Sequence, residues 1–360
     1  MRPDVSRGQN RSAAQAAAAG RVTVRDIAAR LNLSIATVSS ALTGRRPAGF
    51  VTERTRRQVW EAALEMGYPL ERLRSRRPLL ERVAVFTRAN PYSVFQNLTL
   101  ELCRLLGQRE HHILLHAVSD DRQACEIARD LYHRQEVDAA LFVGSRDEPE
   151  AAEVGDLPRV FIGEVPEAAG QWQVSVDSED GGRAAGEHLW DLGHRRVGFL
   201  GSRTNPLASE KRLRGLMSVW EQRGATFDAD WVAYVDYPSE EAVARNLPDF
   251  PARFSGGEAP LTALFCYNDY LAGSVLKILR REGVTVPGAV SVVGFDDAVY
   301  ASLLDPPLTT VVHPFAHLAV EAADLLLLRL RSPDLPPQVR RLPGSLIVRG
   351  STAATAVSES

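Results

Sequence analysis

The sequence predicts two structural parts: an all-α helix-turn-helix headpiece and a larger α/β body of two lobes, each a doubly wound parallel sheet. Three observations predict this. Three short helical patterns with capping residues occupy residues 21–66. From residue 81, apolar runs of strand length alternate with amphipathic helical segments. The sign of the net charge also changes between the two parts. A chain of 360 residues has room for a small domain and one large or two medium ones.

The headpiece begins with an amphipathic pattern that predicts a helix. Val24, Ile27, Ala28 and Leu31 are spaced i, i+3, i+4 and i+7, which places them on one face of a helix. Thr23 stands just before this pattern, where it can cap the free N–H groups of the first turn.

A second helical pattern follows a two-residue break. Ser34 can cap it, and Val38, Ala41 and Leu42 form its apolar stripe. Two short helices joined by a tight turn are the arrangement of a DNA-reading helix-turn-helix, although ordinary helical cores contain such pairs too. The side chains expected to face outward are Ile35, Ala36, Thr37, Ser39 and Ser40. These small hydroxylic or apolar groups can approach phosphates and thymine methyl groups closely.

A third helical pattern and the distribution of charge favour DNA binding over a plain helical core. Thr52 can cap the third helix, which Gly67 ends, so three helices can close a miniature core. Residues 1–78 carry 15 Arg against 6 Asp and Glu, a balance of +9. The remaining residues carry 27 Lys and Arg against 39 Asp and Glu, a balance of −12. A basic head on an acidic body is expected when the head alone touches a polyanion.

The body is predicted from strand and helix patterns that alternate along the chain. Strands are expected at Val83–Thr87, Ile113–Ala117, Ala139–Val143, Arg159–Ile162, Val197–Leu200, Trp231–Val235, Ala263–Cys266, Val290–Gly294 and Thr309–Val312. Helices are expected at Val94–Gln108, Gln123–Gln135, Gly181–Leu192, Ser209–Arg223, Asp269–Glu282 and Phe315–Leu330. The strands exceed one comfortable sheet, so we expect two lobes with chain crossings near 175–180 and 305–310. Ligands of such sheets bind beyond the carboxyl ends of the strands.

Composition excludes several classes of protein. The hydrophobic share of 45% and charged share of 24% are typical of a globular protein, and no apolar run reaches the roughly 18–20 residues of a membrane span. Residues 1–20 lack the apolar core of a signal peptide, so we expect a disordered tail and a cytoplasmic protein. Residues 351–360 are likewise expected to be disordered. Three distant cysteines favour buried thiols over disulfides or a metal site.

The headpiece motifs resemble one known family. The strings T-V-R-D-I-A-A-x-L-x-L-S-x-A-T-V-S-x-A-L-T-G and V-T-x-x-T-R-x-x-V-x-x-A-A-x-E-M-G-Y are similar to the headpiece of LacI-type transcriptional regulators. The resemblance implies a DNA-binding domain at residues 21–66 and a hinge at 67–80. By position it implies base contacts or phosphate contacts from Thr23, Ser34, Ile35, Ala36, Thr37, Ser39, Ser40, Thr43 and Thr55, and from Tyr68 and Arg74 of the hinge. The hinge departs from the family where an arginine replaces its intercalating leucine.

The resemblance continues through the body to about residue 350. The strings Y-N-D-Y-x-A and V-S-V-V-G-F-D-D resemble the family's effector-binding core, which is similar to periplasmic sugar-binding proteins. The resemblance implies that residues 81–350 bind an effector and dimerise. The implied effector contacts are Tyr92, Phe95, Arg212, Asn268 and Asp296. Independently of the family, a guanidinium and a carboxylate facing one cleft can bracket a hydroxyl-rich ligand, and an aromatic ring can cover its apolar side.

These features predict a transcription regulator, a repressor that binds operator DNA as a homodimer. A small-molecule effector, most simply a carbohydrate, would bind between the lobes and change operator affinity. A solute-binding protein without regulation and a sugar-modifying enzyme on the same fold are the alternatives. No nucleophile motif, phosphate-binding loop or zinc-ligand spacing accompanies the Asp296–Asp297 pair, so we expect no enzyme, no cofactor and no metal. Trp172 and Tyr237 are expected to pack in the core.

Overall fold

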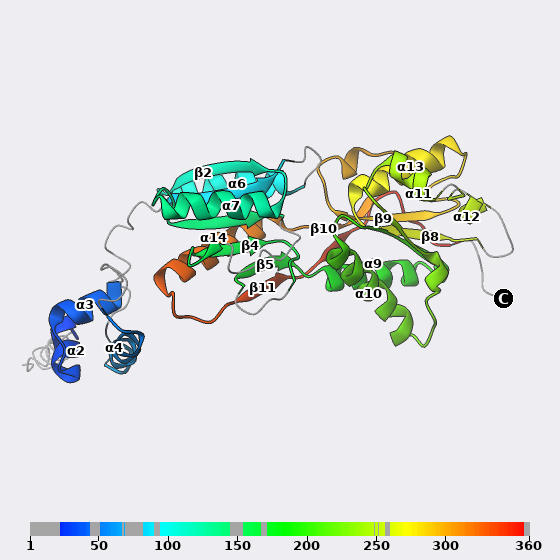
Figure 1. The fold of residues 1–360 in the computed structure, drawn as a ribbon. Coiled ribbons are helices and arrows are strands. Elements are labelled where there is room, and N and C mark those ends of the chain that lie inside the picture. Colours follow the sequence, from blue (N-terminus) through cyan, green and yellow to red (C-terminus); the bar gives the residue numbers. More distant parts are fainter. Residues whose placement is uncertain are drawn as a thin grey trace, which may run out of the picture. The chain divides into compact units, whose positions relative to one another are not determined.

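The computed structural model describes residues 22–43, 51–66, 68, 82–89, 94–144, 154–166, 171–247, 249–250, 252–255 and 260–355. Contacts divide the chain into two compact units, Met1–Leu79 and Leu80–Ser360 (Figure 1). The expected tail at 1–20 and nearly all of the expected hinge at 67–80 lie outside the described residues.

The headpiece contains three helices: α2 (Val24–Leu31), α3 (Ile35–Thr43) and α4 (Glu53–Glu65). Their apolar faces meet in one small core, whose members include Ile27, Val38 and Val59, each fully buried. The hydroxyl of Ser34 accepts the N–H of Thr37 and caps α3, and Thr52 caps α4 in the same way. Thr23 is the N-cap of α2 and forms a capping box with Asp26, whose carboxylate accepts the N–H and the hydroxyl of Thr23.

The first lobe is a parallel sheet with helices on both faces. Its strands, in spatial order, are β11 (Val339–Leu342), β5 (Gln173–Val176), β4 (Arg159–Ile162), β3 (Ala139–Val143), β1 (Arg82–Arg88) and β2 (His112–Val118). Its helices are α6 (Phe95–Gln108), α7 (Asp121–His133) and α14 (Phe315–Arg331). The helices α6 and α14 pack with the apolar side chains of one face, and α7 packs on the other.

The second lobe repeats this plan. Its strands, in spatial order, are β12 (Ser345–Ile347), β10 (Thr309–Val312), β9 (Ser291–Asp296), β8 (Ala263–Cys266), β6 (Val197–Ser202) and β7 (Val232–Val235). Its helices are α9 (Ser178–Asp191), α10 (Pro206–Gln222), α11 (Glu240–Asn246), α12 (Ala252–Ser255) and α13 (Asp269–Arg281), with short 3-10 turns η1 (Ala229–Trp231) and η2 (Ala301–Leu303). β12 pairs antiparallel with β10, and the other pairs are parallel. The predicted fold class is confirmed.

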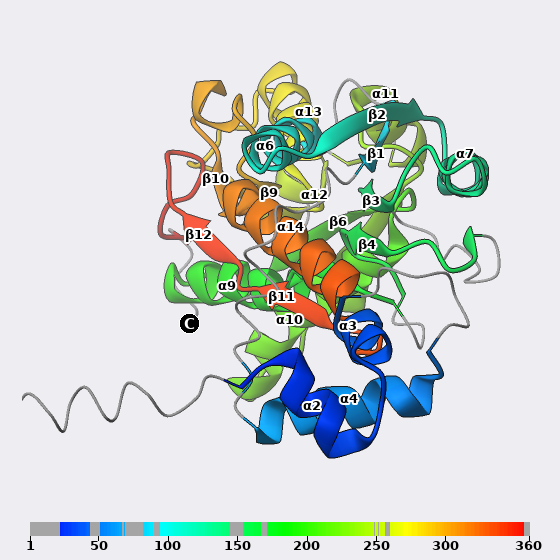
Figure 2. The same cartoon turned by 90° about the vertical axis from the view of Figure 1, so that its left-hand side faces the viewer.

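The chain passes between the lobes at three places. It leaves the first lobe at Asp177, between β5 and α9. It returns at residues 313–314, between β10 and α14, rather than near 305–310, because β10 remains paired with β9 up to Val312. A third crossing, at residues 343–344, was not predicted; it joins β11 to β12, which lie in different sheets (Figure 2).

The expectation of a disordered segment at 351–360 is wrong for residues 351–355. Ser351 is fully buried; its hydroxyl accepts the N–H of Thr309 at 2.8 Å and donates to the carbonyl of Val292 at 2.6 Å. The buried ring of His194 contacts the carbonyl oxygen of Ala353 at 3.0 Å. The sequence did not reveal that this segment is ordered, because its residues are small and show no apolar pattern. Hydrogen bonds, rather than side-chain packing, hold the segment in place.

We expect Ser351→Ala to destabilise the body. The substitution removes a hydroxyl that serves two buried backbone groups, which costs about 2 kcal/mol of unfolding free energy. Denaturant unfolding of the full chain measures the loss. Ser302→Ala, in an exposed turn, is the control and should cost less than about 0.5 kcal/mol. Equal unfolding midpoints for Ser351→Ala and the native chain would contradict a structural role for the segment.

Candidate functional site

The candidate DNA-binding surface is the exposed side of α3. Ile35 is 50% exposed and Ala36 is also exposed, whereas Thr37 and Ser39 are half-buried. The hydroxyls of Ser34 and Thr37 lie 2.7 Å apart, so both are held at the N-terminus of the helix. A helix N-terminus with hydroxyl groups suits contact with a phosphate.

Contrary to the prediction, Ser40 does not face outward. Its exposed fraction is only 7%. A serine hydroxyl extends one bond beyond Cβ, so larger neighbours shield it easily. Contact between Ser40 and a base would therefore need the surrounding groups to move.

The other expected DNA contacts are only partly described. Thr23 is exposed at the start of α2, and the hydroxyl of Thr55 bonds to that of Thr52. Tyr68 is half-buried and packs against the headpiece core, which makes it structural as well. The side chain of Thr43 and the whole of Arg74 lie outside the described residues.

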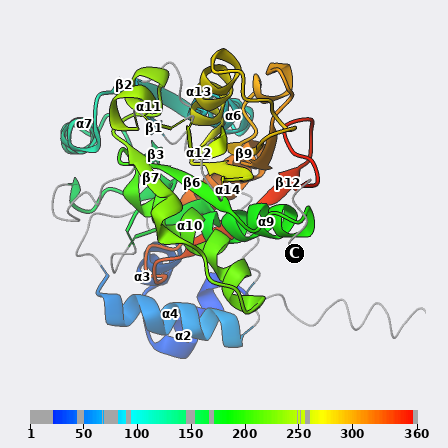
Figure 3. The same ribbon diagram turned by 90° about the vertical axis from the view of Figure 1, so that its right-hand side faces the viewer.

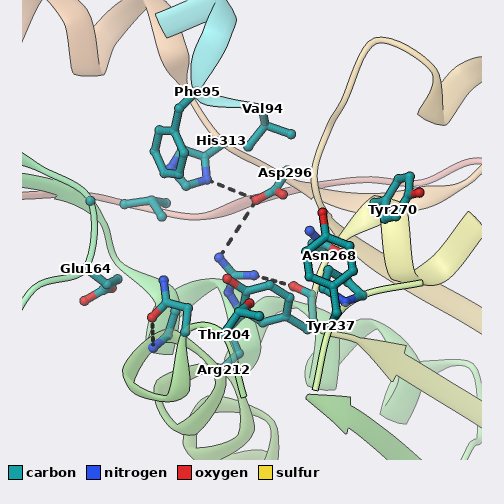
Figure 4. Close-up of a pocket in the computed structure, with 16 residues that line it drawn as sticks. Val94, Phe95, Glu164, Thr204, Arg212, Tyr237, Asn268, Tyr270, Asp296 and His313 are labelled. Atoms are coloured by element: carbon teal, nitrogen blue, oxygen red, sulfur yellow. Dashed lines mark hydrogen bonds and ion pairs between the residues drawn. The ribbon is translucent and has the colours of Figure 1, made fainter. Parts of the chain in front are cut away.

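Four of the five expected effector contacts line one cleft in the body. Phe95, Arg212, Asn268 and Asp296 meet in a hollow of about 730 Å³, part of it open to solvent (Figure 4). Phe95 comes from the first lobe, and the other three come from the second. Arg212 lies in α10, whereas Asn268 and Asp296 lie at or just beyond the carboxyl ends of β8 and β9. Tyr92 lies outside the described residues.

Arg212 is buried rather than placed on the surface. Its guanidinium donates to the carbonyl of Tyr267 and stacks over the Phe295 ring, with Cζ 3.6 Å from the ring centroid. Among the described residues, its Nε atom is buried without a hydrogen-bond partner. A buried donor without a partner costs free energy, so a ligand oxygen at this point would be stabilising.

Two helices in close contact fix the position of Arg212. The helices α9 and α10 lie side by side in the second lobe (Figures 1 and 3). A Cβ atom added to Gly182 would lie 2.1 Å from the backbone oxygen of Arg212, and one added to Gly215 would lie 1.9 Å from that of Glu179. Only glycine allows this approach, and it places Arg212 at the floor of the cleft.

Asp296 faces Arg212 from a strained stretch of backbone. Its φ angle is 115°, and that of Asp297 is 52°. Its Oδ1 atom lies 3.9 Å from a terminal nitrogen of Arg212 and 3.3 Å from Nδ1 of His313. Neither ring nitrogen of His313 completes a hydrogen bond within the described residues. The carboxylate therefore has polar neighbours at loose distances, which a ligand hydroxyl could bridge.

A second buried carboxyl holds this stretch in place. Asp269 is fully buried and accepts the N–H of Ala298 at 2.7 Å and the hydroxyl of Thr310 at 2.5 Å. Burial, together with the nearby charge of Asp296, raises the pKa of Asp269 to about 8. Both causes favour the uncharged form of Asp269 beside the carboxylate of Asp296.

Asn268 has a structural role as well as a place in the cleft. Its side-chain oxygen accepts the N–H of Leu271 and caps α13. Asn205 does the same for α10, with Ala208 as donor. The side-chain NH₂ groups of both residues are therefore the parts suited to a ligand, at the N-termini of two helices.

Three residues at the cleft were missed or misplaced by sequence reasoning. Glu164 and His313 line it, and so does Tyr237, which is 40% exposed instead of packed in the core. Trp172, by contrast, is buried as expected. Each missed residue follows the end of a strand by one or two positions, and that rule could have found them. Among the described residues, no group of three or more His, Cys, Asp or Glu could hold a metal ion.

Comparison with known proteins gives relatives for the whole chain. A family model described as a periplasmic binding protein-like domain matches residues 186–352. The HTH-type transcriptional repressor CytR of Escherichia coli (strain K12) is 29% identical over 343 residues, which are 92% of this chain and 96% of that protein. The HTH-type transcriptional repressor PurR of Aliivibrio fischeri (strain ATCC 700601 / ES114) is 26% identical over 352 residues, covering 92% and 98%.

Solved structures agree with these relatives. A complex of the transcriptional regulator CelR with cellobiose has a TM-score of 0.65 and 25% identity, and the match covers 92% of this chain and 100% of that one. The lac repressor dimer bound to operator and the anti-inducer ONPF has a TM-score of 0.64 and 23% identity, covering 93% and 100%. The likeness thus includes the headpiece as well as the body.

Proposed function

We propose, from the premise that this chain is a LacI-type transcriptional regulator, that it represses transcription and that a small molecule in its cleft controls its affinity for operator DNA. The resemblance predicted from the sequence motifs is confirmed by the relatives and by the fold. One observation supports the proposal most strongly: a basic helix-turn-helix unit and a cleft lined by polar and aromatic side chains occur in one chain. A two-lobed body can couple the two sites when its lobes have two arrangements.

The cleft favours a small, uncharged, hydroxyl-rich effector. Arg212 faces Asp296, and Lys211 pairs with Glu164, so the charges around the cleft already balance. Both hydrogen-bond donors and acceptors remain for hydroxyl groups, and Phe95 offers an aromatic face. The cellobiose in the CelR complex is a ligand of this chemical class. We therefore propose a carbohydrate, and phosphorylated sugars should bind more weakly than neutral ones because Arg212 and Lys211 already face carboxylates.

Exposed apolar side chains support a homodimer. In the first lobe, Leu100 of α6 is 65% exposed and Leu115 of β2 is 51% exposed. In the second, Val299, just before η2, is 73% exposed, and Leu303, within η2, is 80% exposed. Contact with a second copy would remove these side chains from water. Two headpieces would then read the two halves of a pseudo-palindromic operator.

The alternatives have less support. The curated relatives named above are repressors, and a solute-binding protein has no use for a basic helix-turn-helix unit. An enzyme on this fold has less support, because the relatives named above are repressors rather than enzymes. None of the helices in the described ranges is long and apolar enough to cross a membrane. We place the protein in the cytoplasm, where the chromosome is.

We expect the affinity for the chain's own promoter to fall steeply with salt. The +9 balance of residues 1–78 implies that the headpiece displaces several counterions from the duplex. The slope of log Kd against log salt should be several units. Fluorescence anisotropy with a labelled promoter fragment at a series of salt concentrations measures it. A flat response would count against the headpiece as the DNA contact.

A further inference from the structure

A buried ion pair joins the two lobes at the edge of the cleft. Nζ of Lys211 lies 2.5 Å from Oε2 of Glu164, and the two side chains are only 16% and 4% exposed. Glu164 lies on the first lobe and lines the cleft (Figure 4). Lys211 lies on α10 of the second lobe, next to Arg212.

Glu164 is fixed to the first lobe by its neighbours. The preceding residue, Gly163, donates its N–H to the carbonyl of Val174 at 3.0 Å, and its own carbonyl accepts from the side chain of Gln173 at 2.8 Å. The following residue, Val165, is 1% exposed in the core of that lobe. The carboxylate can therefore move relative to the second lobe only if the whole lobe moves.

Lys211 is fixed to the second lobe just as firmly. Two residues before it, the hydroxyl of Ser209 accepts the N–H of Ser202 at 3.1 Å and donates to its carbonyl at 2.9 Å. This ties α10 to the end of β6. The next residue, Arg212, is held by the carbonyl of Tyr267. The ion pair thus connects two rigid bodies.

Glu164 also reaches the first chain crossing. Its second oxygen, Oε1, accepts the N–H of Ser178 at 3.4 Å. Ser178 is the first residue of α9, directly after the crossing at Asp177. A single carboxylate therefore contacts the crossing and α10 together, and both must shift when the lobes separate.

We infer that Glu164 and Lys211 are positioning residues that hold the lobes together across the effector cleft, with or without an effector. Two charges buried side by side stabilise each other, but either one alone is strongly unfavourable in a buried site. Loss of one partner should therefore draw water to the other and open the cleft. This inference rests on the proposed function of the cleft, and its test needs no effector.

The experiment measures the distance between the lobes by pulsed electron spin resonance on the full chain. Spin labels are placed at two exposed positions, His133 of α7 and Gln222 of α10. The half-buried Cys103 is replaced by alanine. Cys125 and Cys266 are buried, so the spin-label reagent does not reach them. Labelled chains are mixed with an excess of unlabelled chains so that only distances within one chain are seen.

The chain with Glu164 and Lys211 intact, labelled at both positions, should give one narrow distribution of label-to-label distances. Glu164→Gln and Lys211→Met should each give a longer mean distance and a broader distribution. Asp236→Asn is the matched control, because Asp236 pairs with Arg203 within the second lobe at 3.0 Å, and it should leave the distance unchanged.

Unchanged distances in both variants, with thermal unfolding still cooperative, would overturn the inference. Glu164→Gln keeps the shape of the side chain, so it decides the matter even when Lys211→Met folds poorly. Operator binding is a separate measurement. A chain that opens as expected but binds no promoter would contradict the proposed function and leave this inference intact.

Discussion

Asp296→Asn should strongly weaken the effector response while operator binding without effector stays native. Asparagine keeps the size of the side chain and tolerates the φ angle of 115°, which alanine would strain. The variant removes the charge that faces Arg212 and accepts hydrogen bonds from a ligand. A hydrogen bond to a charged group contributes about 1.5–3 kcal/mol, which is roughly a 10- to 100-fold loss of effector affinity.

The measurement uses a compound that raises the melting temperature of the native chain, found in a panel of neutral sugars and nucleosides. Promoter affinity is then compared with and without that compound. Asp297→Asn is the control, because its carboxylate pairs with Arg349 at 2.6 Å and does not line the cleft. An Asp296→Asn variant that responds like the native chain would remove Asp296 from the site.

Gly215→Ala should both destabilise the body and weaken effector binding. The added Cβ would lie 1.9 Å from the backbone oxygen of Glu179 and 2.7 Å from the backbone nitrogen of Arg183. No side chain can rotate away to relieve a contact with backbone, so α9 and α10 must separate. Overpacking of this kind costs about 3 kcal/mol or more. Arg212 lies one turn earlier on α10, so its guanidinium should leave the floor of the cleft.

Gly107→Ala provides a matched control. Gly107 lies in α6, and nothing is within 4 Å of the Cβ it would gain. Because alanine favours a helix over glycine, this variant should be more stable by up to about 1 kcal/mol. Denaturant unfolding compares the two variants. Equal stability of Gly215→Ala and the native chain would show that the helix contact is not as close as described.

Much of the fold could be predicted because local patterns and tertiary packing agree. The buried strand at 139–143 and the amphipathic helix near 269–281 show their periods in the sequence and appear in the structure. β11 and β12 were missed, because each has three or four residues and both expose alternate side chains at the sheet edge. β12 pairs with β10, which lies more than 30 residues earlier in the chain, and β11 pairs with β5, which lies more than 160 residues earlier.

The residues of the cleft could likewise be predicted only in part. Arg212, Asn268 and Asp296 were expected from their motifs, and the structure brings them together with Phe95 in one cleft. Glu164 was missed, since its partner Lys211 is 47 residues away and no local pattern links them. Sequence patterns identify residues at strand ends, but they do not say which of these meet across two lobes.

We propose that the basic headpiece binds DNA and that the separate body binds the effector. A comparison of the full chain with a fragment of residues 81–360 tests this division of roles. The fragment should bind the promoter at least about 100-fold more weakly, because it lacks the basic groups that contact phosphates, yet the effector should still raise its melting temperature. A fragment that binds the promoter as tightly as the full chain would contradict the account.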